Sequence, residues 1–297
     1  MTGAVASALL ESLVDYAGLF PPAQLEMDAA VKQYGAHRRS DEAWMLGRFV
    51  VPSTRLSELS AAADPDLPAP GSGEPWPLSV LLGADVAADA ALFAAFGEGH
   101  RGRAVIDAVE LKAATPEQIE RGLEGLPQGL TAYVELPIDS DLPPLLGVLR
   151  ARGARAKVRT GGITTDSIPS PAALARFLVG CAAAGVPFKA TAGLHHAVRG
   201  IHPLTSAADG PRGTMHGFLN VFAAAALARR GALAAEVEAV LGEERPDAFR
   251  LGHDAFWVGT WRIASTELAA ARADFALGFG SCSFEEPVAD LKAMGLL

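Results

Sequence analysis

Short apolar runs alternate along the chain with helix-like segments, and each run is typical of a β-strand. The clearest four are RAVIDAVELK (103–112), TAYVELP (131–137), ARAKVR (154–159) and PFKATAG (187–193). Three more strands are expected before them, at 15–20, 45–51 and 78–83, and one after them, at 275–279. Strand centres in the middle of the chain lie roughly 25 to 35 residues apart, the size of a βα unit. The pattern predicts a (β/α)8 barrel, with an open doubly wound parallel sheet as the alternative.

Two segments interrupt the regular spacing. Residues 64–77 (DPDLPAPGSGEPWP) are rich in Pro and Gly and join a helix to a strand, so we expect a flexible insertion on the bottom of the barrel. Residues 194–263, between strands 7 and 8, follow a strand and should emerge on the top face, where they are expected to form a lid over the site. A hairpin is predicted inside this segment, at 249–263.

Length and composition favour one globular domain spanning residues 1–297. Half of the residues are hydrophobic and 20% are charged, which is enough to bury a barrel-sized core. The net charge of −9 argues against a nucleic-acid partner, because phosphate binding requires clustered cations.

The first 20 residues carry Glu11 and Asp15 and no basic region, so neither a signal peptide nor a membrane span is expected. Two cysteines do not make a disulfide framework, and we expect a cytoplasmic protein. Assembly into a homo-oligomer stays open.

Polar side chains occupy the ends of the four central strands. They are Glu110 and Lys112, Glu135, Lys157 and Arg159, and Lys189 and Thr191. The carboxyl ends of parallel strands converge on one face, and buried charges are costly unless they pair or bind a ligand. These residues are the candidate active site, with His195 or His196 expected at its rim. The competing interpretation is a saturated ion-pair network that serves only the packing of the barrel.

Lysine chemistry is the leading hypothesis for this site. A desolvated lysine beside another cation loses proton affinity, and its neutral amine can form a Schiff base with a carbonyl. Lys189, next to Lys157 or Arg159, would suit that role. The six-residue segments KVRTGG and FKATAG each resemble the strand-end lysine motifs of class I aldolases of the deoxyribose-phosphate type. The proposed catalytic set is Lys189, Lys157, Glu110, Glu135, Lys112 and His195.

Glycine-rich turns suggest that the ligand is an anion. The segment Gly278–Ser281 is expected to follow the last strand and to precede a helix with capping-box spacing between Ser283 and Glu286. Gly161 and Gly162 offer a second cradle after Arg159, which would hold a carboxylate or phosphate. The predicted substrate-binding residues are Arg159, Thr191, Gly161, Gly162, Gly280, Ser281 and His196. Cys282 has no evident base in the sequence; a nucleophile near the helix start is one interpretation, and an inert turn cysteine is the simpler one.

Histidines support an alternative chemistry. His195, His196 and His202 together with Glu110 and Glu135 could ligate a divalent metal, although their spacing matches no ligand signature. The leading hypothesis is therefore a lyase, aldolase-like, that acts on a small anionic carbonyl metabolite and requires no cofactor. The alternatives are a divalent-metal-dependent hydrolase or isomerase and a non-catalytic binding module.

Overall fold

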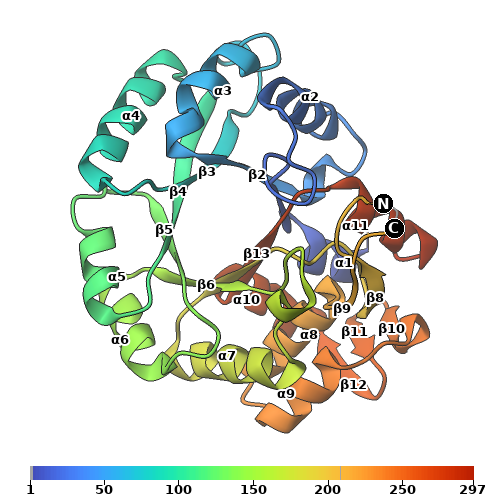
Figure 1. Ribbon diagram of the computed structural model, residues 1–297. Coiled ribbons are helices and arrows are strands. Elements are labelled where there is room, and N and C mark those ends of the chain that lie inside the picture. Colours follow the sequence, from blue (N-terminus) through green and yellow to red (C-terminus); the bar gives the residue numbers. More distant parts are fainter. Residues whose placement is uncertain (1–2, 208) are drawn as a thin grey trace.

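Eight parallel strands close into a barrel surrounded by helices (Figure 1). The computed structural model describes residues 3–207 and 209–297. Residues 1 and 2, which belong to the predicted single domain, and residue 208, which also belongs to the predicted lid, lie outside the described residues. The barrel strands are β1 (Val14–Tyr16), β2 (Leu46–Pro52), β3 (Trp76–Leu81), β4 (Ala104–Lys112), β5 (Thr131–Glu135), β6 (Arg155–Arg159), β7 (Phe188–Thr191) and β13 (Ala276–Ser281).

The sheet closes because β1 pairs on both of its edges. Val14 is opposite Phe279 of β13 on one side and opposite Leu46 of β2 on the other. The remaining strands are paired in chain order from β2 to β7, and β7 pairs with β13. The predicted (β/α)8 barrel is confirmed, and the alternative of an open sheet is wrong because a closed sheet has no edge strands.

Helices cover the outside of the barrel. They are α1 (Ala4–Leu10), α2 (Met27–His37), α3 (Leu56–Ala63), α4 (Val86–Gly99), α5 (Pro116–Leu123), α6 (Leu142–Arg152), α7 (Pro171–Ala184), α8 (Phe218–Arg229), α9 (Ala234–Leu241), α10 (Ser265–Asp274) and α11 (Glu285–Ala293), with 3₁₀ turns at Ala43–Met45, Ser53–Arg55, Thr165–Ser167 and Pro246–Ala248. Pro171 follows the Ser170 cap, whose hydroxyl accepts a hydrogen bond from the Ala173 amide. By length and composition alone, the stretch Thr165–Ala184 could cross a membrane. In the fold it contains α7, which packs against α6, α8 and α9.

The segment between β7 and α10 has three parts. First, β8 (Gly200–Pro203) and β9 (Arg212–Met215) form an antiparallel pair. Next, α8 and α9 join the outer helix layer, where Phe218 of α8 stacks on Phe279 of β13 with 5.4 Å between ring centres. Last, β10 (Phe249–Leu251), β11 (Ala255–Val258) and β12 (Trp261–Ala264) form a three-stranded antiparallel sheet in place of a simple hairpin.

Several predicted boundaries need correction. The first strand begins at Val14 and ends at Tyr16, not at residue 20, and the chain then turns. The last strand extends to Ser281, so Gly280 and Ser281 are strand residues opposite Asp15 and Tyr16, not a turn after the strand. Trp76 and its neighbour Pro77 belong to β3 rather than to the preceding loop, because the Trp76 indole is buried in the core.

The Pro/Gly-rich loop before β3 is tied to the bottom of the barrel by one arginine. Arg103, which directly precedes β4, donates hydrogen bonds to Asp64 Oδ1 (2.6 Å) and to the Asp64 and Pro68 carbonyls (2.7 and 3.1 Å). The loop therefore lies at the amino ends of the strands, opposite the charged strand ends.

Candidate functional site

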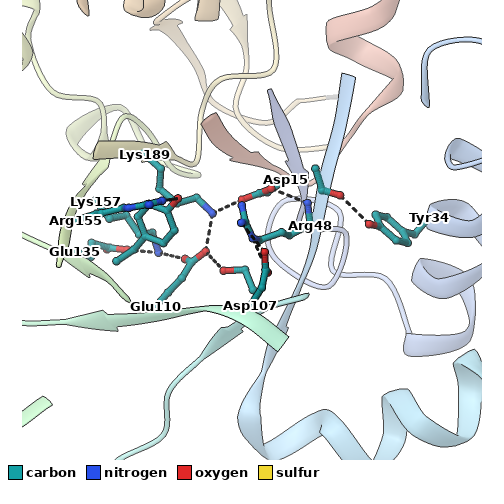
Figure 2. A network of polar contacts seen from close by, with 12 residues as sticks. Asp15, Tyr34, Arg48, Asp107, Glu110, Glu135, Arg155, Lys157 and Lys189 are labelled. Carbon is teal, nitrogen blue, oxygen red and sulfur yellow. Dashed lines mark hydrogen bonds and ion pairs between the residues drawn. The ribbon is translucent and has the colours of Figure 1, made fainter. Parts of the chain in front are cut away.

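Five charged side chains from five different strands meet inside the barrel. They are Asp15 of β1, Glu110 of β4, Glu135 of β5, Lys157 of β6 and Lys189 of β7. Figure 2 shows how they point toward one another. None of them is more than 8% exposed. Charges at this depth persist only as matched partners, so the contacts within the group determine its chemistry.

Lys189 is held by two carboxylates. Its Nζ donates hydrogen bonds to Asp15 Oδ2 (2.5 Å) and Glu110 Oε1 (2.7 Å), and it lies 5.2 Å from the centre of the Tyr133 ring. Burial by itself lowers the pKa of Lys189, but the charges of Asp15 and Glu110 outweigh it, and the pKa is raised above its ordinary value. The sequence had predicted a lowered pKa for Lys189, because its expected neighbours, Lys157 and Arg159, are cations. That prediction is wrong. Lys189 is therefore an ammonium ion at neutral pH.

The carboxylate of Glu110 lies between the two lysines and offsets the repulsion between their charges. Its Oε1 accepts from Lys189 and from Ser79 Oγ (2.7 Å), and its Oε2 lies 2.7 Å from Lys157 Nζ. Burial acts to raise the pKa of Glu110, yet the charges of Lys189 and Lys157 prevail and hold it well below the usual range. A permanent carboxylate thus bridges the two ammonium groups.

Glu135 connects this network to the surface. Its Oε2 lies 2.8 Å from Lys157 Nζ, its Oε1 accepts from Arg159 Nε (3.3 Å), and Lys112 Nζ is 3.9 Å away from Oε1. Burial acts to raise the pKa of Glu135, but the charge of Lys157, followed by those of Arg159 and Lys112, holds the pKa low. Among the described residues no donor makes an aligned hydrogen bond to Oε2, so the Lys157 contact is an ion pair and Oε2 can accept a further hydrogen bond.

A cavity of about 440 Å³ opens above this network at the carboxyl ends of the strands. Of the predicted residues, its lining contains Glu110, Lys112, Glu135, Lys157, Arg159, Gly161, Gly162, Thr191, His195 and Gly280. Lys189 does not line it but lies beneath, and neither Ser281 nor His196 borders it. The cavity presents Lys112, Lys157 and Arg159, together with His195, whose pKa is raised to about 9, against two carboxylates. It is suited to a small anion.

Two glycines bring the loops after β6 and β7 into contact. A Cβ on Gly161 would lie 2.9 Å from Gly193 Cα, and Gly193 itself has a φ of +77°. Ala192 also adopts a positive φ, of 60°. The packing of these loops is therefore sufficient reason for glycine at 161, although Gly161 and Gly162 both border the cavity.

The loop after β7 turns its two adjacent histidines toward α11. His195 Nδ1 is 2.7 Å from Glu286 Oε2, and His196 Nδ1 is 3.1 Å from Asp290 Oδ2, one helical turn further along. His196 also stacks on His202, with 3.5 Å between ring centres. These histidines border a second cavity of about 700 Å³, partly walled by the β8–β9 pair.

The candidate metal ligands do not converge. Each of the adjacent histidines pairs with its own carboxylate on α11, while Glu110 and Glu135 pair with lysines. Within residues 3–207 and 209–297, no group of three His, Cys, Asp or Glu side chains is arranged to hold a metal ion.

Sequence reasoning missed four residues of this region. Asp15 was placed in the first strand but not in the site, although an Asp within an apolar strand (VDY) is a signal of a paired charge.

Cys282 has a base after all, because His195 Nε2 lies 3.9 Å from its Sγ. Glu286 was predicted to close a capping box. Its amide does donate to Ser283 Oγ (3.2 Å), but its side chain contacts His195, so the box is only half formed. Asp290 was not considered.

Comparison with known protein families and with curated protein sequences finds no match for this chain. The class of protein is therefore defined by the fold and the site. It is a (β/α)8 barrel with a buried network of two lysines and three carboxylates beneath a cation-rich cavity.

Proposed function

We propose that the protein is a lyase of the aldolase type, which forms a Schiff base between Lys157 and a small anionic carbonyl compound. One observation carries the proposal. Two lysines on neighbouring strands share the Glu110 carboxylate, and only Lys157 reaches the cavity. A strand-end lysine in an enclosed, partly apolar cavity is the arrangement that imine formation requires. The nucleophile is therefore assigned to Lys157 and not to Lys189.

Lys189 has a supporting role in this proposal. As an ammonium ion it keeps Glu110 charged and fixed. Glu110, whose Oε2 lies 2.7 Å from Lys157 Nζ, in turn orients that amine. A substrate carbonyl would then approach Lys157 from above.

Lys157 must lose a proton before it attacks, and Glu135 is the nearest acceptor on the cavity side. Glu135 Oε2 lies 2.8 Å from Lys157 Nζ. Without substrate, Arg159 and Lys112 contribute to the low pKa of Glu135. An incoming carboxylate or phosphate pairs with these two cations, weakens their effect on Glu135 and makes it a better base.

The bond changes are those of imine-assisted cleavage. The amine adds to the carbonyl carbon, and the resulting carbinolamine loses water to give an iminium ion. This cation accepts the electron pair of the neighbouring carbon–carbon bond as that bond breaks, while a carboxylate takes the proton of the β-hydroxyl group. Protonation of the enamine and hydrolysis of the imine then release the second product and restore Lys157. His195, on the cavity wall, is available for the protonation step.

Several bulk features fit this role. The cavity volume suits a small metabolite, and Gly162, Thr191 and Gly280 border it where an anionic group would lie. Both cysteines are unpaired, and with the acidic composition this supports a cytoplasmic enzyme.

The test is reductive trapping with sodium borohydride. The purified protein is incubated with a panel of small oxo-acids and sugar phosphates, reduced, digested and mapped by mass spectrometry at all five lysines. We expect a stable adduct at Lys157 that is lost in Lys157→Met and kept in Lys292→Met, which changes an exposed lysine of α11. Turnover abolished by a chelator and restored by metal, with no adduct, would instead favour the metal-dependent hydrolase or isomerase. Binding without adduct or turnover would favour the binding module.

A further inference from the structure

Cys282, His195 and Glu286 are arranged in the order of a nucleophile, a base and an orienting carboxylate. Cys282 Sγ lies 3.9 Å from His195 Nε2, and the opposite ring nitrogen, Nδ1, lies 2.7 Å from Glu286 Oε2. The three residues come from the β13–α11 loop, the loop after β7 and the first turn of α11. The contact between a nucleophile and its base is often longer than about 3.2 Å before substrate binds.

We propose that these three residues form a second reactive centre, in which Cys282 accepts the acyl group of an ester or thioester. The centre does not use Lys157. Cys282 and His195 border both the lysine cavity and the larger cavity beside α11, so an acyl compound can reach the sulfur from the α11 side.

The charges around the pair support a reactive sulfur. Burial by itself lowers the pKa of His195, but Cys282 and Glu286 outweigh it and raise the pKa to about 9. His195 is therefore an imidazolium ion at neutral pH, and its Nε2 holds a proton 3.9 Å from the Cys282 sulfur. The other titratable groups nearby are Glu285, His196 and Tyr16, and Tyr16 stays neutral because burial raises its pKa.

Cys181 provides an internal contrast. It is fully buried in α7, and burial alone raises its pKa far above the ordinary value. The chain thus carries one thiol beside a cationic imidazole and one thiol in an apolar core, where thiols are inert.

The larger cavity can hold a polar acyl compound. Its lining includes His202 and Arg212 from the β8–β9 pair, which can face an anionic group. Thr205 Oγ1, also in this wall, is buried and has no hydrogen-bond partner among the described residues. Helix α11 begins three residues after Cys282, and the positive end of its dipole favours the negative oxygen that forms during acyl transfer.

The proposed reaction has two balanced steps. The Cys282 thiolate attacks the acyl carbon, a C–S bond forms, and the bond to the leaving alkoxide or thiolate breaks as that group takes the Nε2 proton of His195. Water then attacks the acyl-cysteine and gives one proton to His195 Nε2. The products are the free acid and the original ion pair, and no oxidant or reductant is needed.

The test uses p-nitrophenyl acetate at pH 7, with release of p-nitrophenolate and the mass of tryptic peptides as readouts. We expect Cys282 to gain one acetyl group while Cys181 stays unmodified. His195→Asn should slow the acetylation of Cys282 about 100-fold, the usual contribution of a general acid or base. The acetylation rate of Glu286→Gln should lie between those of His195→Asn and the unaltered protein. Circular dichroism and the melting temperature confirm that each variant is folded.

A second measurement keeps the proposal independent of any folding defect. Cys282→Ser closely matches the native side chain and should show no burst of p-nitrophenolate. The proposal is overturned if Cys282 of the unaltered protein reacts no faster than N-acetylcysteine, or if His195→Asn reacts equally fast while folded. Because the acetyl group is read on Cys282 itself, this result stands whether or not an imine forms at Lys157.

Discussion

Replacing Asp15 with Asn tests whether the buried network is a set of matched charges. The substitution keeps an oxygen for the Arg48 amide, which donates to Asp15 Oδ1 at 2.7 Å, but removes the charge 2.5 Å from Lys189 Nζ. Loss of one partner from a buried ion pair costs about 3–5 kcal/mol. Because Lys189 keeps Glu110 as a second partner, we expect a loss near the lower end, about 3 kcal/mol of unfolding free energy.

The assay is urea unfolding followed by tryptophan fluorescence. Asp274→Asn is the matched control, because it breaks the exposed Arg229–Asp274 pair at 2.6 Å and should cost less than about 1 kcal/mol. Combining Asp15→Asn with Lys189→Met should cost less than the sum of the single changes, by about 1 kcal/mol or more, since the two side chains are in contact. If Asp15→Asn is as mild as Asp274→Asn, or if the two changes add, the network is not the matched set described above.

Two further predictions concern positions around the site. His216 is buried, its Nε2 lies 2.8 Å from the Pro169 carbonyl, and burial lowers its pKa to about 4. As the pH falls, the unfolded chain therefore binds a proton at this histidine before the native state does, and the unfolding free energy should fall by roughly 3 kcal/mol between pH 6.5 and 4. Urea titrations should show the unfolding free energies of the unaltered protein and of His216→Gln converging in this range. If the unfolding free energy of the variant has the same dependence on pH as that of the unaltered protein, the assignment is refuted. Gly161→Ala should cost about 1–3 kcal/mol and reduce imine trapping, because its Cβ would meet Gly193 Cα at 2.9 Å. Gly147→Ala is its control, since Gly147 lies in α6 with open space around it and should be neutral or stabilising; equal melting temperatures for the two variants would contradict the close approach.

The barrel could be predicted because its signal is local. Each strand shows an apolar run, and the polar residues that end β4 to β7 mark the face where those strands converge. In a closed parallel sheet, neighbouring strand ends must meet, so Glu110, Glu135, Lys157 and Arg159 could be placed together without knowledge of their contacts.

The charge state of Lys189 could not be predicted in this way. It depends on Asp15, which is 174 residues distant in the chain and lies on a strand of only three residues. Asp15 comes within reach because β1 and β7 both pair with β13 in the closed barrel. Without it, the nearest charges to Lys189 in the predicted sheet were cations, and the expected direction of its pKa was wrong.

The partners of His195 depend on backbone geometry that the sequence shows only faintly. The positive φ values of Ala192 and Gly193 turn the chain after β7, and this turn directs His195 and His196 to two carboxylates on α11. A glycine at 193 is compatible with such a turn, but it does not specify which helix the histidines meet. The contact between Cys282 and His195 therefore appears only in the folded structure.

The most direct measurement of the central claim is the site of the reduced imine. When a trapping carbonyl compound is found, borohydride reduction should place the added mass on Lys157, with Lys189 unmodified because its ammonium is held by Asp15 and Glu110 beneath the cavity. An adduct on Lys189, or one that persists in Lys157→Met, would contradict the assignment of Lys157 as the nucleophile.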